Sequence, residues 1–262
     1  LDEARLRRIL EEACGGIEGT DFTALLEETK RSLFDGVAEE DVDKAATMSA
    51  RTFVEREPNY TYVAARLLLD SLRKEALSFV AGRKEEATQA EMTEKYPEYF
   101  QNYIKKAIDL ELLDPRLANY DLSKLGAAIK PERDFNFNYL GIQTLYDRYF
   151  IQSNDVRFEL PQVFFMRVSM GLAINEIDPE EWSIKFYNLL SSFDFMSSTP
   201  TLFNSGTLRP QLSSCYLTSV PDDLDGIFGA IKDDALLSKF AGGLGNDWTP
   251  VRGMGAHIKG TN

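Results

Sequence analysis

A cysteine that follows two serines is the residue best suited to chemistry in this sequence. Cys215 ends the run LSSC at 212–215, and a turn-rich stretch of Ser and Thr at 197–201 precedes it. Hydroxyls and backbone amides that converge on a thiol can hold a small polar ligand against it. Cysteine is also common as a small apolar residue on a buried strand, so the pattern alone leaves a packing role for Cys215 open.

A glycine-rich loop near the end of the sequence is the second candidate. Between Trp248 and Gly260 it holds Arg252, His257 and Lys259 among several glycines. Glycine lets the backbone approach a phosphate while Arg and Lys neutralise it. The loop is therefore a candidate phosphate-binding element, and an ordinary surface loop is the alternative.

Other kinds of site are poorly supported. The only histidine, His257, and the two cysteines, Cys14 and Cys215, supply neither a Ser/His/Asp arrangement nor an ordinary zinc site within this chain. The pair Gly243-x-Gly245 lacks the third glycine of a dinucleotide fingerprint, because Trp248 stands there, and it follows a predicted helix. Paired carboxylates in polar helical segments indicate solvated faces.

The composition indicates a globular protein of one or two domains. The chain has 262 residues, 44% of them hydrophobic, and a net charge of -13. Such an acidic chain is poorly suited to nucleic acid, and no apolar run approaches the ~18 residues of a membrane span. The start shows no signal peptide and the two cysteines cannot form a disulfide framework, so we expect a cytoplasmic protein.

Helical periodicity dominates residues 1–195. Over residues 1–80 the apolar spacing predicts a small four-helix bundle, with Thr20 or Asp21 as the cap of the second helix. The charged, apolar-poor segment 82–96 predicts a linker or exposed arm and a domain boundary. The first predicted helix ends at Gly15, and the other three cover about 22–34, 40–56 and 62–79.

The pattern changes towards the end of the chain. Residues 149–159 predict a hairpin with a polar turn at 153–155, and Pro161 and Pro179 each open a helix. After Asp194, turn-rich segments and short strands alternate with helices, which predicts the opening units of an α/β domain. The elements expected there are a strand at 212–217, a helix from about Asp225 and a second helical stretch near 233–240.

Several short runs, in order and at the right spacing, closely resemble the large subunit of class I ribonucleotide reductases. They are PNYTYVAARL at 58–67, STPTLFNSG at 198–206, QLSSCYL at 211–217, PDDLDGI at 221–227, GGLG at 242–245 and RGMGAHI at 252–258. The resemblance covers essentially the whole chain and implies a mainly α fold. The implied domains are a truncated or degenerate ATP-cone-like four-helix module at 1–81, a linker at 82–96, a helical domain at 97–195 and the start of a ten-stranded α/β barrel, with an effector loop, at 196–262.

The resemblance implies an oxidoreductase for DNA precursor synthesis. The family reduces ribonucleoside diphosphates to deoxyribonucleoside diphosphates by thiyl-radical chemistry, and a redox cysteine pair supplies the reducing equivalents. Cys215 matches one member of that pair. Thr199 and Ser214 match residues that hold the substrate through its phosphates and ribose, and Gly243 matches a backbone contact.

The resemblance also implies an effector site and partners. Asp222, Leu224, Arg252 and Lys259 fall where the family binds the dNTP or ATP effector that selects the substrate; this site lies at a subunit interface, which implies a homodimer or higher oligomer. A carboxylate repels phosphate, so Asp222 is expected at the ribose or base. No cofactor or metal is expected in this chain, because a metal-containing small subunit supplies the radical. The other implied partners are the C-terminal remainder of the large subunit and a thioredoxin- or glutaredoxin-type reductant, with neither nucleic acid nor membrane.

Some family features are missing from this sequence. The radical cysteine, the second redox cysteine and the C-terminal cysteine pair are absent, and both ends look cut, so the chain alone is expected to be inactive. The cone begins after the family's basic hairpin. Glu3 and Glu39 stand where the family commonly has lysine and threonine, and only Lys74 keeps the expected basic character. Carboxylates repel a triphosphate, so we expect a cone that does not bind ATP.

Two other interpretations stay open. A catalytically inert regulatory or scaffold relative would keep the cone and the helical domain, and the number of cysteines in the complete polypeptide separates it from an enzyme. A cobalamin-dependent class II reductase shares the cysteine strand but needs no radical-generating small subunit.

Overall fold

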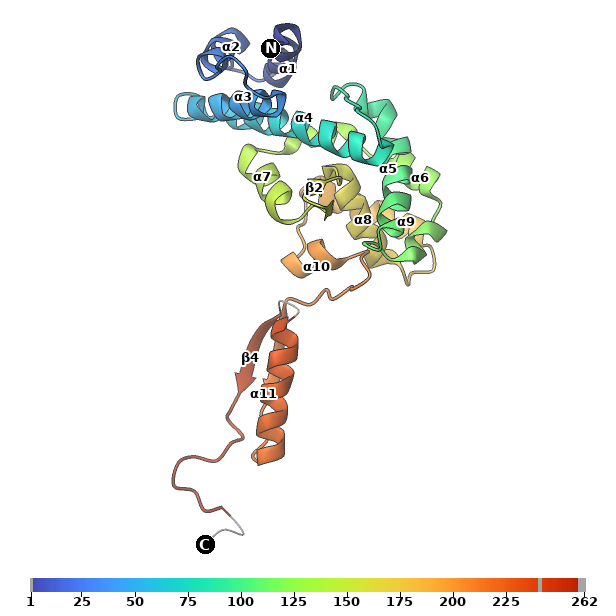
Figure 1. Cartoon of the computed structure of the whole chain (residues 1–262). Helices are drawn as coiled ribbons and strands as arrows, with labels where there is room; N and C mark the ends of the chain where they lie inside the picture. The colour runs from blue at the N-terminus through green and yellow to red at the C-terminus, as the bar shows by residue number, and fades with distance from the viewer. Residues whose placement is uncertain (1, 240–241, 259–262) are drawn as a thin grey trace. The chain divides into compact units, whose positions relative to one another are not determined.

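The chain forms two compact units. The computed structural model describes residues 2–239 and 242–258. The first unit runs to Met196 and includes Gly206–Leu208, and the second comprises Ser197–Ser205 and the residues from Arg209 on. The first unit is mainly helical, whereas a parallel strand pair and a long helix form most of the second (Figure 1). This agrees with the predicted order of helices first and an α/β beginning second.

Four helices form the N-terminal module, as predicted. Asp2 caps α1 by accepting from the Arg5 N–H, and Asp21 caps α2 by accepting from the N–H groups of Thr23 and Ala24. The chain leaves α4 at Gly82 with φ of 68°, a left-handed conformation that glycine adopts readily. The helices are α1 (Glu3–Cys14), α2 (Phe22–Arg31), α3 (Glu39–Phe53) and α4 (Tyr60–Ala81).

The segment after α4 is packed rather than exposed. Ala87 and Gln89 are buried, and Arg73 of α4 donates to the Ala87 carbonyl at 3.1 Å and to Gln89 Oε1 at 2.8 Å. Helix α5 (Met92–Asp109) begins inside the range predicted as a linker. The prediction of an exposed arm at 82–96 is therefore wrong, because its polar groups satisfy the buried guanidinium of α4.

The rest of the first unit is a helical domain with one hairpin. The predicted hairpin is confirmed: β1 and β2 pair antiparallel, and Asn154 and Asp155 have φ of 51° and 64°, as a two-residue hairpin turn requires. The helices opened by Pro161 and Pro179 are confirmed as well. The elements are η1 (Pro115–Asn119), α6 (Leu122–Ala128), η2 (Pro131–Asn136), α7 (Tyr139–Arg148), β1 (Gln152–Ser153), β2 (Val156–Arg157), α8 (Pro161–Ala173) and α9 (Pro179–Ser191).

A fully buried ion pair lies at the centre of this domain. Arg167 of α8 donates from Nε to Glu159 Oε1 at 2.9 Å and from Nη2 to Glu159 Oε2 at 3.0 Å. Tyr103 of α5 and the Ile151 N–H also donate to the Glu159 carboxylate. Burial alone would lower the pKa of Arg167, but the charge and hydrogen bonds of Glu159 raise it, so the guanidinium stays protonated.

A glycine anchors the segment 206–208 to the helical unit. Gly206 has φ of 79°, and a Cβ atom there would lie 2.9 Å from the Arg167 carbonyl oxygen, so a larger residue would clash with the backbone of α8. The Gly206 carbonyl accepts from the Asp114 N–H at 3.0 Å, and Thr207 bridges to Leu113. The chain is therefore fixed between Ser205 and Arg209, the residues that flank this segment.

The second unit contains the opening βαβ of an α/β domain. Strands β3 (Cys215–Ser219) and β4 (Gly243–Asp247) pair in parallel, with helix α11 (Leu224–Lys239) between them in sequence (Figure 1). The strand begins at Cys215 rather than at residue 212. One helix replaces the two helical stretches predicted near Asp225 and 233–240, because no breaker interrupts the run. A short helix, α10 (Thr199–Asn204), precedes β3.

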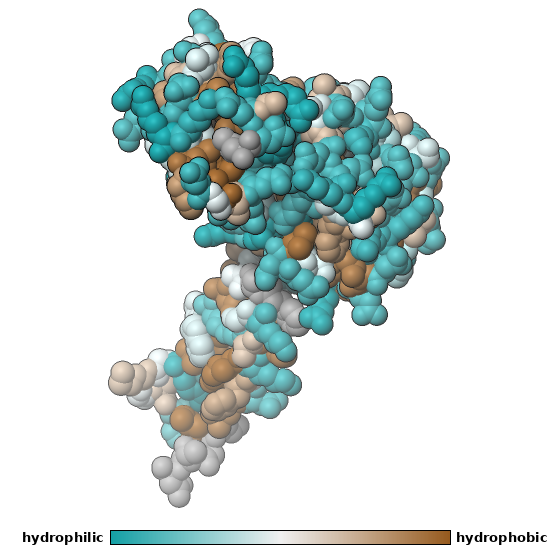
Figure 2. All heavy atoms as spheres, turned by 45° about the horizontal axis from the view of Figure 1, so that its top comes forward, coloured by the Kyte–Doolittle hydropathy of each residue, from teal (hydrophilic) through white to brown (hydrophobic). Residues whose placement is uncertain are grey.

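The surface of the second unit carries many apolar side chains. Leu217 and Leu224 are 91% and 74% exposed, and Phe228 and Met254 are exposed too. Figure 2 shows hydrophobic residues along this unit amid a mainly hydrophilic surface elsewhere. In the part of the chain that the structure describes, no helix is both long and apolar enough to cross a membrane.

The buried ion pair yields a first prediction. Replacing Arg167→Met leaves the Glu159 charge buried without its partner, so the free energy of unfolding should fall by about 3–5 kcal/mol. Urea unfolding of the chain measures this. Arg116→Met, which removes a half-exposed guanidinium paired with Asp114, is the matched control and should cost less than about 1 kcal/mol. Equal losses in the two variants would contradict the central role of the buried pair.

Candidate functional site

The candidate redox cysteine begins strand β3, directly beside β4. Cys215 is in register with Gly243, whose N–H donates to the Ser214 carbonyl at 2.8 Å. A Cβ atom at Gly243 would lie 3.2 Å from that carbonyl oxygen and 3.6 Å from Cys215 Sγ, so the glycine keeps the neighbouring strand close to the thiol. The structure thus brings together three residues that the sequence analysis singles out: Ser214, Cys215 and Gly243.

The two cysteines differ in accessibility. Cys215 is exposed in the described structure. The alternative role, as a small residue packed on a buried strand, is therefore not what the structure shows. Cys14 is buried in α1, and burial raises the pKa of its thiol to about 11. The thiolate is the reactive form of cysteine, so Cys215 rather than Cys14 is suited to thiol chemistry.

An open pocket of about 760 Å³ adjoins Ser214 within the second unit. Thr199 and Ser214, the two predicted substrate-binding side chains, both line it. Hydroxyl, amide and guanidinium groups beside apolar surface suit a ligand with both polar and apolar parts. The remaining lining residues are Ser198, Pro200, Phe203, Asn204, Arg209 and Gln211.

Hydrogen bonds hold the two walls of this pocket together. Asn204 Nδ2 donates to the Gln211 carbonyl at 2.8 Å, and Thr201 Oγ1 donates to the Leu212 carbonyl at 3.1 Å. Helix α10 is thereby tied to the segment 209–212. Arg209 was not predicted as a site residue, although it is the only charged residue from 195 to 221.

The predicted effector residues are placed as follows. Arg252 and Asp222 form an ion pair, with Arg252 Nε 2.8 Å from Asp222 Oδ2, and the Arg252 N–H donates to Asp222 Oδ1 at 3.2 Å. The sequence predicted separate roles for them, Arg252 at phosphate and Asp222 at the ribose or base. It did not predict that they pair with each other across 30 positions. Leu224 is exposed at the start of α11, and the His257 carbonyl accepts from Arg252 Nη1 at 3.1 Å. Lys259 lies outside the described residues.

In the N-terminal module, Lys74, the predicted nucleotide-binding lysine, forms ion pairs with carboxylates. Lys74 pairs with Glu39, and its Nζ also lies 3.9 Å from Asp43 and 3.7 Å from Glu86. The hydrogen bond from Lys74 and its charge lower the pKa of Glu39. Glu3 pairs with Lys30 at 2.6 Å instead. Of Glu3 and Glu39, it is therefore Glu39 that pairs with Lys74 directly.

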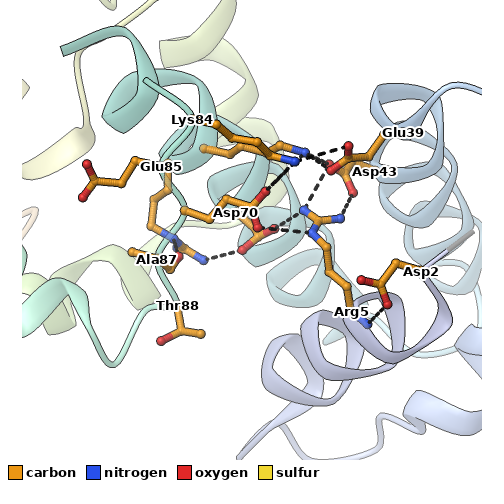
Figure 3. Close-up of polar contacts among 12 residues, drawn as sticks. Asp2, Arg5, Glu39, Asp43, Asp70, Lys84, Glu85, Ala87 and Thr88 are labelled. Atoms are coloured by element: carbon orange, nitrogen blue, oxygen red, sulfur yellow. Dashed lines mark hydrogen bonds and ion pairs between the residues drawn. The ribbon is translucent and has the colours of Figure 1, made fainter. Parts of the chain in front are cut away.

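A second basic residue in the same cluster is also occupied. Arg5 of α1 lies 2.7 Å from Asp43 and 3.4 Å from Asp70 (Figure 3). It also lies 3.6 Å from Glu86, so it joins α1 to α3, α4 and the segment after α4. No local sequence pattern separates Arg5 from the other arginines of α1, which explains why sequence reasoning missed it.

The polar pocket beside this cluster has balanced charges. It measures about 240 Å³, and its lining includes three cationic and three acidic side chains. Burial raises the pKa of Asp70, although Arg73 and Arg5 oppose that shift. A triphosphate entering the pocket would meet carboxylates as well as cations. The charged lining residues are Arg5, Arg8, Lys74, Asp70, Glu86 and Glu91.

Within the described ranges, no group of three or more His, Cys, Asp or Glu side chains is placed to hold a metal ion.

Comparison with known proteins places these features in one class. Residues 135–210 match the profile described as "Ribonucleotide reductase, all-alpha domain", and residues 213–262 match "Ribonucleotide reductase, barrel domain". The pocket of Thr199 and Ser214 draws on both matched ranges, and Cys215 lies in the second. Two successive stretches of the chain thus carry the sequence signatures of two ribonucleotide reductase domains.

Relatives extend the match over the whole chain. The chain is 46% identical over 264 residues to the ribonucleoside-diphosphate reductase subunit alpha of Chlamydia muridarum. This alignment covers 100% of the chain and 24% of that protein. It is 38% identical to the subunit alpha of Helicobacter pylori and 36% identical to the large subunit of Danio rerio, covering 32% and 31% of those proteins. The chain belongs to the ribonucleotide reductase large-subunit family, and it spans about a quarter to a third of the length of these relatives.

The occupied cluster yields a second prediction. Because Arg5 and Lys74 are already paired with carboxylates, the N-terminal module should bind neither ATP nor dATP with micromolar affinity. Isothermal titration calorimetry of the chain and of its Lys74→Ala variant with each nucleotide tests this, and no saturable heat that depends on Lys74 is expected. A micromolar dissociation constant that Lys74→Ala abolishes would show that the nucleotide displaces the carboxylates.

Proposed function

We propose that this chain is part of the large subunit of a class I ribonucleoside-diphosphate reductase, which reduces ribonucleoside diphosphates to deoxyribonucleoside diphosphates. The observation that carries the proposal is the placement of an exposed Cys215 between Ser214 and the backbone of Gly243, with Thr199 and Ser214 lining one adjacent pocket. An exposed thiol next in sequence to a residue that lines a pocket fits a thiol-driven reduction of a bound nucleotide.

Cys215 acts in this proposal as one of two reducing thiols. Two thiols lose two electrons and two protons as they join in a disulfide, and the substrate exchanges its 2′-hydroxyl, lost as water, for hydrogen. Cys14 is buried in α1 and its raised thiol pKa makes it a poor donor. The second redox cysteine and the radical cysteine that removes the 3′ hydrogen are therefore assigned to the part of the subunit beyond this chain.

The proposed partners follow from this division of labour. A metal-containing small subunit supplies the radical, a thioredoxin- or glutaredoxin-type protein reduces the disulfide, and the subunit pairs with a second copy. The exposed apolar side chains of the second unit, Leu217 and Phe228 among them, support burial against further barrel elements or a second subunit. We propose a cytoplasmic location for the assembly.

The pair of Arg252 and Asp222 is the proposed effector contact. Arg252 is the proposed partner of the effector phosphates and would exchange its ion pair with Asp222 for them, which leaves Asp222 for the ribose hydroxyls or a base edge. Leu224 and Lys259 complete the proposed set, with Leu224 offering an apolar contact for the base.

The redox role of Cys215 yields a third prediction. In the complete reductase, Cys215→Ser should abolish thioredoxin-driven turnover, because a hydroxyl cannot form the disulfide. The melting temperature should change little, since an exposed Cys→Ser exchange leaves no cavity. The matched control is Cys14→Ala, which should retain turnover. Full turnover by Cys215→Ser would overturn the assignment.

The effector role of Arg252 yields a fourth prediction. Arg252→Ala should weaken binding of an effector triphosphate by roughly 1–3 kcal/mol, the scale of a charged hydrogen bond. The effector-dependent change in the ratio of substrates reduced should shrink in parallel, and competition assays with two diphosphates measure it. Arg31→Ala, which removes a guanidinium that is 75% exposed in α2, should leave the ratio unchanged. Unaltered substrate selection by Arg252→Ala would identify the loop as an ordinary surface loop.

A further inference from the structure

Gln211 lines the 760 Å³ pocket, and its side-chain amide is bonded to the segment that leads into strand β3. Its Nε2 donates to the Ser213 carbonyl at 2.9 Å and to the Tyr216 hydroxyl. Its main-chain carbonyl accepts from Asn204 Nδ2 of α10 at 2.8 Å. Gln211 is therefore fixed both by its backbone and by its side chain.

The two peptide groups that flank Ser214 are each anchored by a hydrogen bond. The Ser213 carbonyl, in the peptide group before Ser214, accepts from Gln211 Nε2. The Ser214 carbonyl, in the peptide group after it, accepts from the Gly243 N–H at 2.8 Å. Because a peptide group is planar, anchoring both groups restricts the two backbone dihedral angles of Ser214. These angles set the directions of the Ser214 hydroxyl and of the Cys215 side chain that follows.

The second hydrogen bond of the amide reaches strand β3 itself. Tyr216 follows Cys215, and its ring packs against the backbone at Gly242, where a Cβ atom would lie 2.8 Å from Tyr216 Cε2. Successive side chains of a strand point to opposite faces, so Tyr216 lies on the face opposite the thiol. The bond between Gln211 and Tyr216 therefore steadies the start of β3 and leaves the face of Cys215 open.

The oxygen of the same amide indicates that stability alone does not account for a glutamine here. Gln211 Oε1 is buried and has no hydrogen-bond partner among the residues that the structure describes. A buried acceptor without a partner costs free energy. Ser213 is solvent-exposed, so water can satisfy its carbonyl when the amide is absent. An apolar side chain of similar size would avoid the unpartnered oxygen, which points to a geometric role for the amide nitrogen.

We propose that Gln211 is a positioning residue of the redox site. Its amide holds the backbone so that the Ser214 hydroxyl faces the pocket and Cys215 Sγ faces the ribose of the bound nucleotide. The inference rests on the proposed function, in which Cys215 helps to reduce a nucleoside diphosphate, and adds a residue that acts through Ser214 and Cys215.

Steady-state kinetics of the complete reductase with Gln211→Leu and Gln211→Glu test this. Neither side chain can donate both hydrogen bonds, so kcat should fall roughly ten- to a hundred-fold, the loss expected when a reacting group is displaced by about 1 Å. The affinity for cytidine 5′-diphosphate, measured by calorimetry, should fall only a few-fold, because Thr199 on α10 keeps its place. The melting temperature of Gln211→Leu should stay close to that of the parent enzyme.

Two further variants isolate the hydrogen bond to the Ser213 carbonyl. Tyr216→Phe leaves that bond intact and should lower kcat much less than Gln211→Leu does. Gln101→Leu is the matched control: Gln101 of α5 also donates from Nε2 to a backbone carbonyl, that of Pro97 at 3.3 Å, but it does not line the pocket. It should leave kcat unchanged. If Gln211→Glu does not fold, Gln211→Leu decides alone.

The outcomes separate this inference from the proposed function. Parental kcat in the folded Gln211 variants would overturn the positioning role, as would a lower melting temperature with unchanged kcat per folded subunit. A loss of diphosphate affinity as large as the loss of kcat would identify Gln211 as a direct substrate contact and would overturn it too. All three results leave the proposed function standing, which fails instead if Cys215→Ser keeps full turnover.

Discussion

The buried pair of Glu159 and Arg167 is the interaction on which the helical unit depends. One carboxylate collects donors from α5, from the backbone before the hairpin and from α8, so three separate stretches of chain meet at a single charge. A charge this deeply buried is tolerable only when every lone pair is matched. The Arg167 carbonyl also sets the close approach of Gly206. The stability of the helical unit and the anchoring of the segment 206–208 therefore share one point.

Hydrogen bonds within the second unit hold the candidate site together. Thr199 and Ser214 line one pocket. The two stretches of chain that form its walls are cross-linked by the hydrogen bonds of Asn204 and Thr201. A binding site built in this way loses little entropy when it orders a ligand.

Charge is distributed unevenly in this acidic protein. In the N-terminal module, Arg5 and Lys74 are held by carboxylates from α3, α4 and the following segment, so the cluster works as an internal cross-link. Around α10 the sequence contains a single cation and no acid. Paired charges therefore stabilise the N-terminal module, whereas charged residues are sparse in the sequence around α10.

Local patterns in the sequence predicted the helices and the hairpin well. Asp21 as a cap, Pro161 and Pro179 at helix starts and the polar turn at 153–155 act within a few residues, so they can be read without tertiary information. The order of the reductase-like runs also predicted that Thr199, Ser214, Cys215 and Gly243 belong to one site. In the structure the last three adjoin and Thr199 and Ser214 line one pocket, while their role in one site stays a prediction.

What the sequence did not show depends on contacts between distant positions. The pairing of Arg252 with Asp222 spans 30 residues and that of Arg5 with Asp43 spans 38, and neither has a local signature. The segment 82–91 looks like a linker because its residues are polar, yet Gln89 is buried against Arg73 of the preceding helix. Polarity alone does not distinguish a solvated residue from one that satisfies a buried donor.

The central claim is that Cys215 and the pocket of Thr199 and Ser214 form one site for a nucleoside diphosphate. The most direct measurement is a crystal structure of the complete large subunit with cytidine 5′-diphosphate bound. The account predicts phosphate density beside Thr199 and Ser214, with the ribose facing Cys215 Sγ. Nucleotide bound elsewhere while this pocket stays empty, or a ribose turned away from Cys215, would contradict it.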